Sequence, residues 1–74
     1  MDERVQECLN DLIFNVEELL SFVAGMSYED YREDRKTQAA VERKFEIIGE
    51  ALNRLSRINP ELLSQITNYR SIIS

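Results

Sequence analysis

The stretch "AVERKFEIIGEALNRL", from Ala40 to Leu55, decides how this chain folds. Its apolar residues recur every three or four positions, which predicts a helix with one buried face. That face carries Ala40, Val41, Phe45, Ile48, Ala51, Leu52 and Leu55. Gly49 lies inside the same helix, where glycine costs about 1 kcal/mol relative to alanine. We therefore expect a neighbouring backbone or side chain to approach the helix closely at Gly49.

Working outward, the same helix is predicted to run from Tyr28 to Arg57. Its first part, residues 28–38, is highly charged and is expected to project into solvent. Ser27 and Asp30 have the spacing of a capping box, in which each side chain bonds a free backbone N–H at the start of a helix. The sequence thus predicts a helix start at "SYED".

The N-terminal segment predicts another long helix, from about Asp2 to about Ala24. Its apolar residues alternate in steps of four and three, which is the pattern of a heptad seam. The seam consists of Val5, Leu9, Leu12, Val16, Leu19 and Val23. Further apolar residues, Cys8, Ile13, Phe14, Leu20 and Phe22, widen the stripe, so more than one neighbour is expected. Gly25 suits the left-handed position that ends many helices.

The "INPELL" stretch marks a boundary, with Asn59 as the cap and Pro60 at the first position of a short helix to about Thr67. A fourth element would begin at "NYRSIIS" with Tyr69, Ile72 and Ile73. The class is all-α, an antiparallel helical bundle. We treat residues 1–74 as one domain, with its last helix truncated.

A chain of 74 residues is small for an independent fold. A core of this size rarely supplies more than about 3–5 kcal/mol. The single cysteine, Cys8, allows no internal disulfide and is expected in the core, because no histidine is present to activate it. The same lack of histidine argues against zinc. We therefore expect a second copy or a partner chain to cover part of the apolar surface.

The net charge of −5 argues against a dedicated nucleic-acid binder, since such proteins usually present a basic face. The N-terminus lacks the pattern of a signal peptide, and no apolar run approaches the roughly 20 residues of a membrane span. A lone cysteine suits a reducing compartment. The expected location is the cytoplasm, with no membrane partner.

The run from Ser27 to Leu55 resembles the HepT-like branch of the HEPN superfamily. The most specific part is "AVERKFEIIGEA". The matching residues are Tyr31, Asp34, Ala40, Val41, Arg43, Glu46, Ile47, Ile48, Gly49, Glu50, Ala51 and Leu55. The first helix and "NPELLSQITNYRSII" are similar to the family less specifically.

The resemblance implies a ribonuclease toxin, usually dimeric, that is encoded beside a minimal nucleotidyltransferase antitoxin. The antitoxin silences such toxins by adding AMP groups to a tyrosine. Catalysis in the family uses an Arg followed, four to six residues later, by a His. An arginine stabilises charge on the scissile phosphate, and a histidine serves as general acid or base near neutral pH. An RNA substrate is implied for the complete protein only.

The departure from this pattern is the lack of any histidine. A His four to six residues after Arg70 would lie beyond Ser74. None of Tyr28, Tyr31 and Tyr69 matches the modified tyrosine. We therefore assign no catalytic, cofactor-binding or metal-binding residue, and expect the chain to be inactive alone. It would be the non-catalytic N-terminal scaffold of a HepT-like toxin. The alternative is a stand-alone helical module that regulates a HEPN or nucleotidyltransferase partner by dimerisation.

Some side chains leave two interpretations open. Glu46 and Glu50 lie one helical turn apart and could bind a metal, or could be solvated carboxylates helped by Arg43, Lys44 or Arg54. The resemblance assigns Arg43, Glu46 and Glu50 to a supporting layer around the missing motif, or to an interface. The tyrosines Tyr28 and Tyr31 could stack on RNA bases or pack on the end of the first helix. Core or interface roles are expected for Phe14, Phe22 and Phe45.

Overall fold

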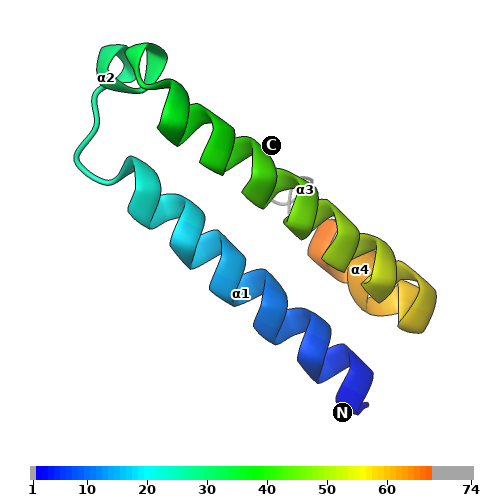
Figure 1. Cartoon of the computed structure of the whole chain (residues 1–74). Helices are drawn as coiled ribbons and strands as arrows, with labels where there is room; N and C mark the ends of the chain where they lie inside the picture. The colour runs from blue at the N-terminus through cyan, green and yellow to red at the C-terminus, as the bar shows by residue number, and fades with distance from the viewer. Residues whose placement is uncertain (1, 68–74) are drawn as a thin grey trace.

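The computed structural model describes residues 2–67, which form four helices and no strand. In chain order these are α1 (Glu3–Val23), α2 (Tyr28–Glu33), α3 (Arg35–Ile58) and α4 (Pro60–Thr67). Figure 1 shows α1 and α3 side by side and antiparallel, with α4 folded back against the C-terminal end of α3. The all-α prediction is confirmed. The predicted fourth element at residues 69–73 lies outside the described residues.

Local capping signals position the helix ends where the sequence predicts them. The side chain of Asp2 accepts a hydrogen bond from the Arg4 N–H at 2.8 Å, at the start of α1. Gly25 has a φ of +76°, the left-handed conformation that glycine adopts without strain. The carboxamide oxygen of Asn59 accepts from the Leu62 N–H at 3.0 Å, at the start of α4. The hydrogen bonds to Asp2 and Asn59 each satisfy a backbone N–H that a helix end leaves free.

The predicted helix from Tyr28 to Arg57 is wrong in one respect, because it is interrupted at Asp34. Asp34 has φ −102° and ψ 91°, outside the helical region, and so separates α2 from α3. Its carboxylate accepts from the Thr37 N–H at 3.0 Å and from the Thr37 hydroxyl at 2.7 Å. An aspartate that caps the next helix competes with continuation of the previous one. The Ser27–Asp30 capping box at the start of α2 is confirmed.

The buried core is concentrated at the end of the helix pair that α4 covers. Its centre is Val5, Cys8 and Leu55, at 1%, 2% and 0% exposure. Partly buried apolar side chains surround this cluster: Leu9, Leu12, Ile58, Leu62 and Leu63. We call these eight residues the apolar end. The prediction that Cys8 is a core residue is confirmed.

The seam predicted for α1 differs from the observed one at its centre. Val16 is 40% exposed, whereas Asn15 beside it is buried at 8%. Asn15 can be buried because its amide is hydrogen-bonded on both sides. It donates to the Asp11 carbonyl at 2.7 Å and accepts from Lys44 of α3 at 2.8 Å. At the centre of the seam, a long-range polar contact thus takes the place of the apolar contact that the heptad pattern predicts.

The structure bears on two further expectations. Phe14 and Phe45 are 60% and 62% exposed, which excludes a core role in this chain and leaves the interface role a prediction, while Phe22 is half-buried. At Gly49, an added methyl group would meet no atom of the described residues within 4 Å other than its chain neighbours and the adjacent backbone of α3. The expected close neighbour at Gly49 is therefore not found among residues 2–67.

Candidate interface on the third helix

The three residues assigned to a supporting layer or an interface lie on the side of α3 that faces away from α1. Positions three and four apart share a helix face, and this face carries Arg43, Glu46, Glu50, Asn53 and Arg57. We call it the outer face of α3. All five of its residues are exposed. The structure thus brings Arg43, Glu46 and Glu50 together in one row.

Arg43 and Glu46 form an ion pair within this row. The guanidinium Nη1 and the carboxylate Oε2 are 3.2 Å apart, and the two side chains are 65% and 66% exposed. Exposed pairs of this kind contribute about 0–1 kcal/mol. Because so little stability depends on the pair, both groups are free to exchange their bond for one to a partner molecule.

Further along the row, Glu50 lines a shallow open depression with Asn53, Arg54 and Arg57. Arg54 is held by Asp11 of α1, with 2.9 Å between Nη2 and Oδ2. This hydrogen bond raises the pKa of the Arg54 guanidinium, which stays fully charged. The Arg57 guanidinium makes no hydrogen bond or ion pair with any residue from 2 to 67. The depression therefore holds two guanidinium groups beside the Glu50 carboxylate. The Arg54 group is paired with Asp11, and the Arg57 group has no partner among residues 2–67.

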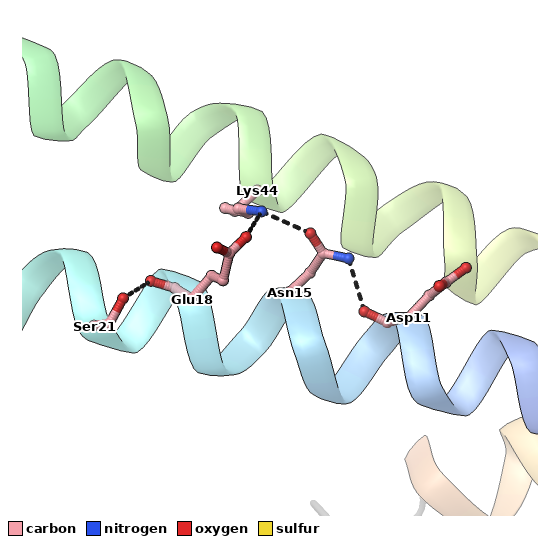
Figure 2. A network of polar contacts seen from close by, with 5 residues as sticks. All are labelled: Asp11, Asn15, Glu18, Ser21 and Lys44. Carbon is pink, nitrogen blue, oxygen red and sulfur yellow. Dashed lines mark hydrogen bonds and ion pairs between the residues drawn. The ribbon is translucent and has the colours of Figure 1, made fainter.

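The neighbours predicted for the two glutamates are only partly correct. Arg43 does pair with Glu46, but Lys44 turns to the opposite side of α3. Figure 2 shows the Lys44 ammonium between Asn15 and Glu18 of α1, where it bonds both. Arg54 pairs with Asp11 and not with Glu50. Among the described residues, no group of three or more metal-ligating side chains is placed to hold a metal ion.

The sequence reasoning missed the contact of Asn15, Glu18 and Lys44, which we call the polar bridge. A signal for it was present. Lys44 lies seven residues before Ala51, and Asn15 seven residues after Cys8, so each occupies the heptad position of a buried residue. A polar side chain in an otherwise apolar seam indicates a specific partner across the interface.

The two tyrosines of α2 differ in their exposure. Tyr28 is 77% exposed, and α2 has no buried residue. The interpretation that Tyr28 packs on the end of the first helix is therefore wrong. Tyr31 is half-buried, and its carbonyl accepts from the Gln38 amide at 2.9 Å. This bond ties the short helix to α3.

No helix within residues 2–67 combines the length and the apolar character needed to cross a membrane.

The described chain is all-α, with α1 paired against α3, a helix cap at "SYED" and the "AVERKFEIIGEA" run on α3. These are features of a HEPN-type helical protein. The comparison with known families agrees, since the profile described as Ribonuclease HepT-like matches residues 12–73. The chain belongs to this family, as its sequence resemblance indicated.

Two curated relatives support the assignment. One is "Putative RNase MJ0127" of Methanocaldococcus jannaschii, 37% identical over 51 residues, which are 69% of this chain and 42% of the relative. Another is "Probable ribonuclease HepT" of Thermococcus cleftensis, 38% identical over 61 residues, covering 77% of this chain and 56% of the relative. The chain thus spans about half the length of these relatives. No solved structure matches the chain.

Proposed function

We propose that these 74 residues are the non-catalytic scaffold of a HepT-like ribonuclease toxin, one that acts in the cytoplasm and is paired with a minimal nucleotidyltransferase antitoxin. The observation that carries the proposal is the family match over residues 12–73, together with a sequence that contains no histidine. The names of the two relatives, an RNase and a ribonuclease HepT, support the same activity for the whole protein.

The lack of histidine bears directly on chemistry. General acid–base cleavage of RNA moves protons on and off the reacting groups, and histidine is the side chain that most often serves this role near neutral pH. The outer face of α3 offers only arginines, an amide and exposed carboxylates. Its proposed part is to support the missing motif or to contact a partner, with Arg43, Glu46 and Glu50 in that role.

We also propose that the chain forms a homodimer. The support is an exposed apolar face made of Ile13, Val16, Leu20 and Phe45, which are 57%, 40%, 58% and 62% exposed. The three α1 residues follow a spacing of three and four, so they share one side of α1. Viewed down α1 from its N-terminus, these three residues are rotated to one side of the buried face. Viewed down α3 in the same way, Phe45 is rotated from the buried face of α3 in the same direction. In an antiparallel pair, that places all four on one side of the molecule.

The scaffold proposal is tested by assaying the purified chain on RNA. We expect no cleavage above background. Cleavage that copurifies with the chain and disappears in Arg43→Ala or Glu50→Ala would contradict it. Reading the coding DNA past the Ser74 codon is the companion test. A continued frame with an Arg and, four to six residues later, a His would assign the activity to the longer protein.

The dimer proposal is tested by light scattering at micromolar concentration. We expect a dimer that Phe45→Ser weakens. Tyr28→Ser is the matched control, because Tyr28 is more exposed, at 77%, but lies outside the exposed apolar face. A folded, monodisperse monomer for the unmodified chain would exclude the dimer.

The second candidate is a stand-alone interaction module that regulates a HEPN or nucleotidyltransferase partner, and the same exposed apolar face favours it. Mixing experiments separate the two. A regulator forms a stable complex with a complete family member and lowers its ribonuclease activity. A scaffold fragment leaves that activity unchanged.

A further inference from the structure

We propose that the polar bridge of Asn15, Glu18 and Lys44 selects the register in which α1 pairs with α3. The need for such a device follows from the apolar residues themselves. Along α1, buried or half-buried residues repeat at intervals of seven, in the series Val5, Leu12, Leu19 and the series Cys8, Asn15, Phe22. The same holds along α3, in the series Val41, Ile48, Leu55 and the series Lys44, Ala51, Ile58.

A seven-residue repeat on both helices leaves the register ambiguous. Sliding α1 by seven residues, about 10 Å along its axis, again sets apolar residues against apolar residues at most positions. Hydrophobic burial is non-directional and depends on the area removed from water. Burial still favours the native alignment at the apolar end, because a slide of seven residues moves Val5 and Cys8 away from Leu55. Along the rest of the seam it separates the alignments only weakly. The two polar members of the series, Asn15 and Lys44, distinguish the alignments.

The native alignment satisfies both polar side chains. The Lys44 ammonium donates to the Asn15 amide oxygen at 2.8 Å and to the Glu18 carboxylate. Its side chain is only 13% exposed, so these bonds replace most of its water. The rings of Phe14 and Phe22 lie 5.7 and 6.0 Å from the ammonium, within the range of cation–π attraction. No buried side-chain polar atom in the described part of the chain lacks a partner.

Each shifted alignment breaks this arrangement. Sliding α1 one way would place Cys8 opposite Lys44. Asp11 would then lie where Glu18 now lies, beside Lys44. Arg4 would lie where Asp11 now lies, so its guanidinium group would face that of Arg54. Like charges side by side oppose pairing.

Sliding α1 the other way would place Phe22 opposite Lys44 and would move Asn15 into the apolar end. The Asn15 amide would keep its bond to the Asp11 carbonyl, because both residues lie on α1. Its oxygen, however, would be buried without a donor, and an unpaired buried polar group is disfavoured. Both shifts are thus penalised by polar groups, and a single polar residue in a heptad seam is known to select register in this way.

The test measures the register directly by pulsed electron spin resonance. Spin labels are attached at Asn10→Cys and Glu42→Cys, both exposed, in a chain carrying Cys8→Ala so that no other thiol reacts. The labelled chain is diluted with unlabelled protein, so only distances within one chain are recorded. This reference is expected to show one distance. Several distances in the reference would overturn the proposal.

The decisive variant adds Asn15→Leu and Lys44→Met, which replaces both partners together and leaves no unpaired amide. We expect a folded helical protein with at least one further label distance, displaced by up to about 10 Å from the reference. A matched control adds Asp11→Asn, which removes the exposed ion pair to Arg54 and should keep one distance. One unchanged distance in the double variant would overturn the proposal. Loss of its helical circular dichroism would do the same, since the bridge would then supply stability and not register.

Discussion

The two halves of the α1–α3 contact are built from different chemistry. At the apolar end, Val5, Cys8 and Leu55 are at most 2% exposed and α4 covers them. In the middle of the helix pair, the polar bridge occupies the equivalent heptad positions. The comparison indicates that the apolar end supplies most of the stability, since burial of apolar area is the dominant favourable term in folding.

The polar bridge contributes differently. Removing an ammonium from water has a cost that its hydrogen bonds and charge partner largely offset, so the net gain is small. Its value depends on geometry, because one alignment satisfies every group and others do not. The four predictions that follow test this division of roles, from the largest expected effect to the smallest.

Leu55→Ala should break the apolar end. Leu55 is 0% exposed, and truncating a buried leucine costs about 2–5 kcal/mol. A core of this size supplies about 3–5 kcal/mol in total, so the variant should be largely unfolded at 25 °C. Circular dichroism with urea titration measures this. Ile66→Ala is the matched control, since Ile66 is 42% exposed, lies outside the exposed apolar face and loses as many carbon atoms, so that its loss should change chain stability little. Equal losses at both positions would refute the proposed location of the core.

Lys44→Ala should damage the polar half without abolishing the fold. It leaves the Asn15 amide oxygen without its donor, and a buried unsatisfied acceptor costs about 1–3 kcal/mol. Arg43→Ala, one residue away on the outer face of α3, removes an exposed ion pair and should cost less than about 1 kcal/mol. Urea midpoints of the two variants give the comparison. A larger loss for Arg43→Ala would contradict the assignment of buried and exposed faces.

Gly49→Ala should stabilise the helix between the two halves. A glycine inside a helix costs roughly 0.5–1 kcal/mol relative to alanine. Apart from its chain neighbours and the adjacent backbone of α3, no atom of the described residues lies within 4 Å of the added methyl group. Thermal unfolding at fixed protein concentration should show a higher midpoint. A lower midpoint would reveal a neighbour at Gly49, in a second copy or elsewhere, as the sequence led us to expect.

Acid should weaken the start of α3, at the end of the helix pair remote from the apolar end. Hydrogen bonds from the Thr37 N–H, and then from its hydroxyl, lower the pKa of Asp34 below its usual 3.8. Between these values the unfolded chain binds more protons than the folded one, so stability rises with pH. The contribution of Asp34 is complete above pH 3.8 and is lost as the pH falls through the folded pKa.

Asp34→Asn isolates the contribution of Asp34 ionisation to stability, because asparagine also caps helices but does not titrate. Urea unfolding between about pH 2 and 5 should show a shallower pH dependence for Asp34→Asn than for the unmodified chain. Some dependence should remain, since the bond from Arg4 also lowers the pKa of Asp2. Identical pH profiles would exclude the Asp34–Thr37 contact as a source of acid sensitivity.

Much of the fold could be predicted because its signals are local. The capping box at Ser27, the left-handed Gly25 and the Asn59–Pro60 start of α4 all appear as predicted. In each, the residues that interact lie within three or four positions of one another. The interruption at Asp34 was missed, although its cause is local too. The helical periodicity on either side of Asp34 outweighed its capping preference in our interpretation.

The candidate interface was predicted in part. Arg43, Glu46 and Glu50 share the exposed outer face of α3, as their spacing implies. The partners of Lys44 and Arg54 could not be predicted, because each pairs with a residue on α1. Neither Phe14 nor Phe45 could be assigned to core or surface from the sequence, since that depends on which side of each helix meets the other.

The sequence by itself determined the helical class, most helix ends and the family, because backbone hydrogen bonding and side-chain periodicity act over a few residues. Only the tertiary structure decided that Asn15 and not Val16 faces α3, and that Lys44 turns inward. The physical reason is the distance along the chain. The Lys44–Asn15 bond joins residues 29 positions apart. Such a contact exists only after the two helices have paired.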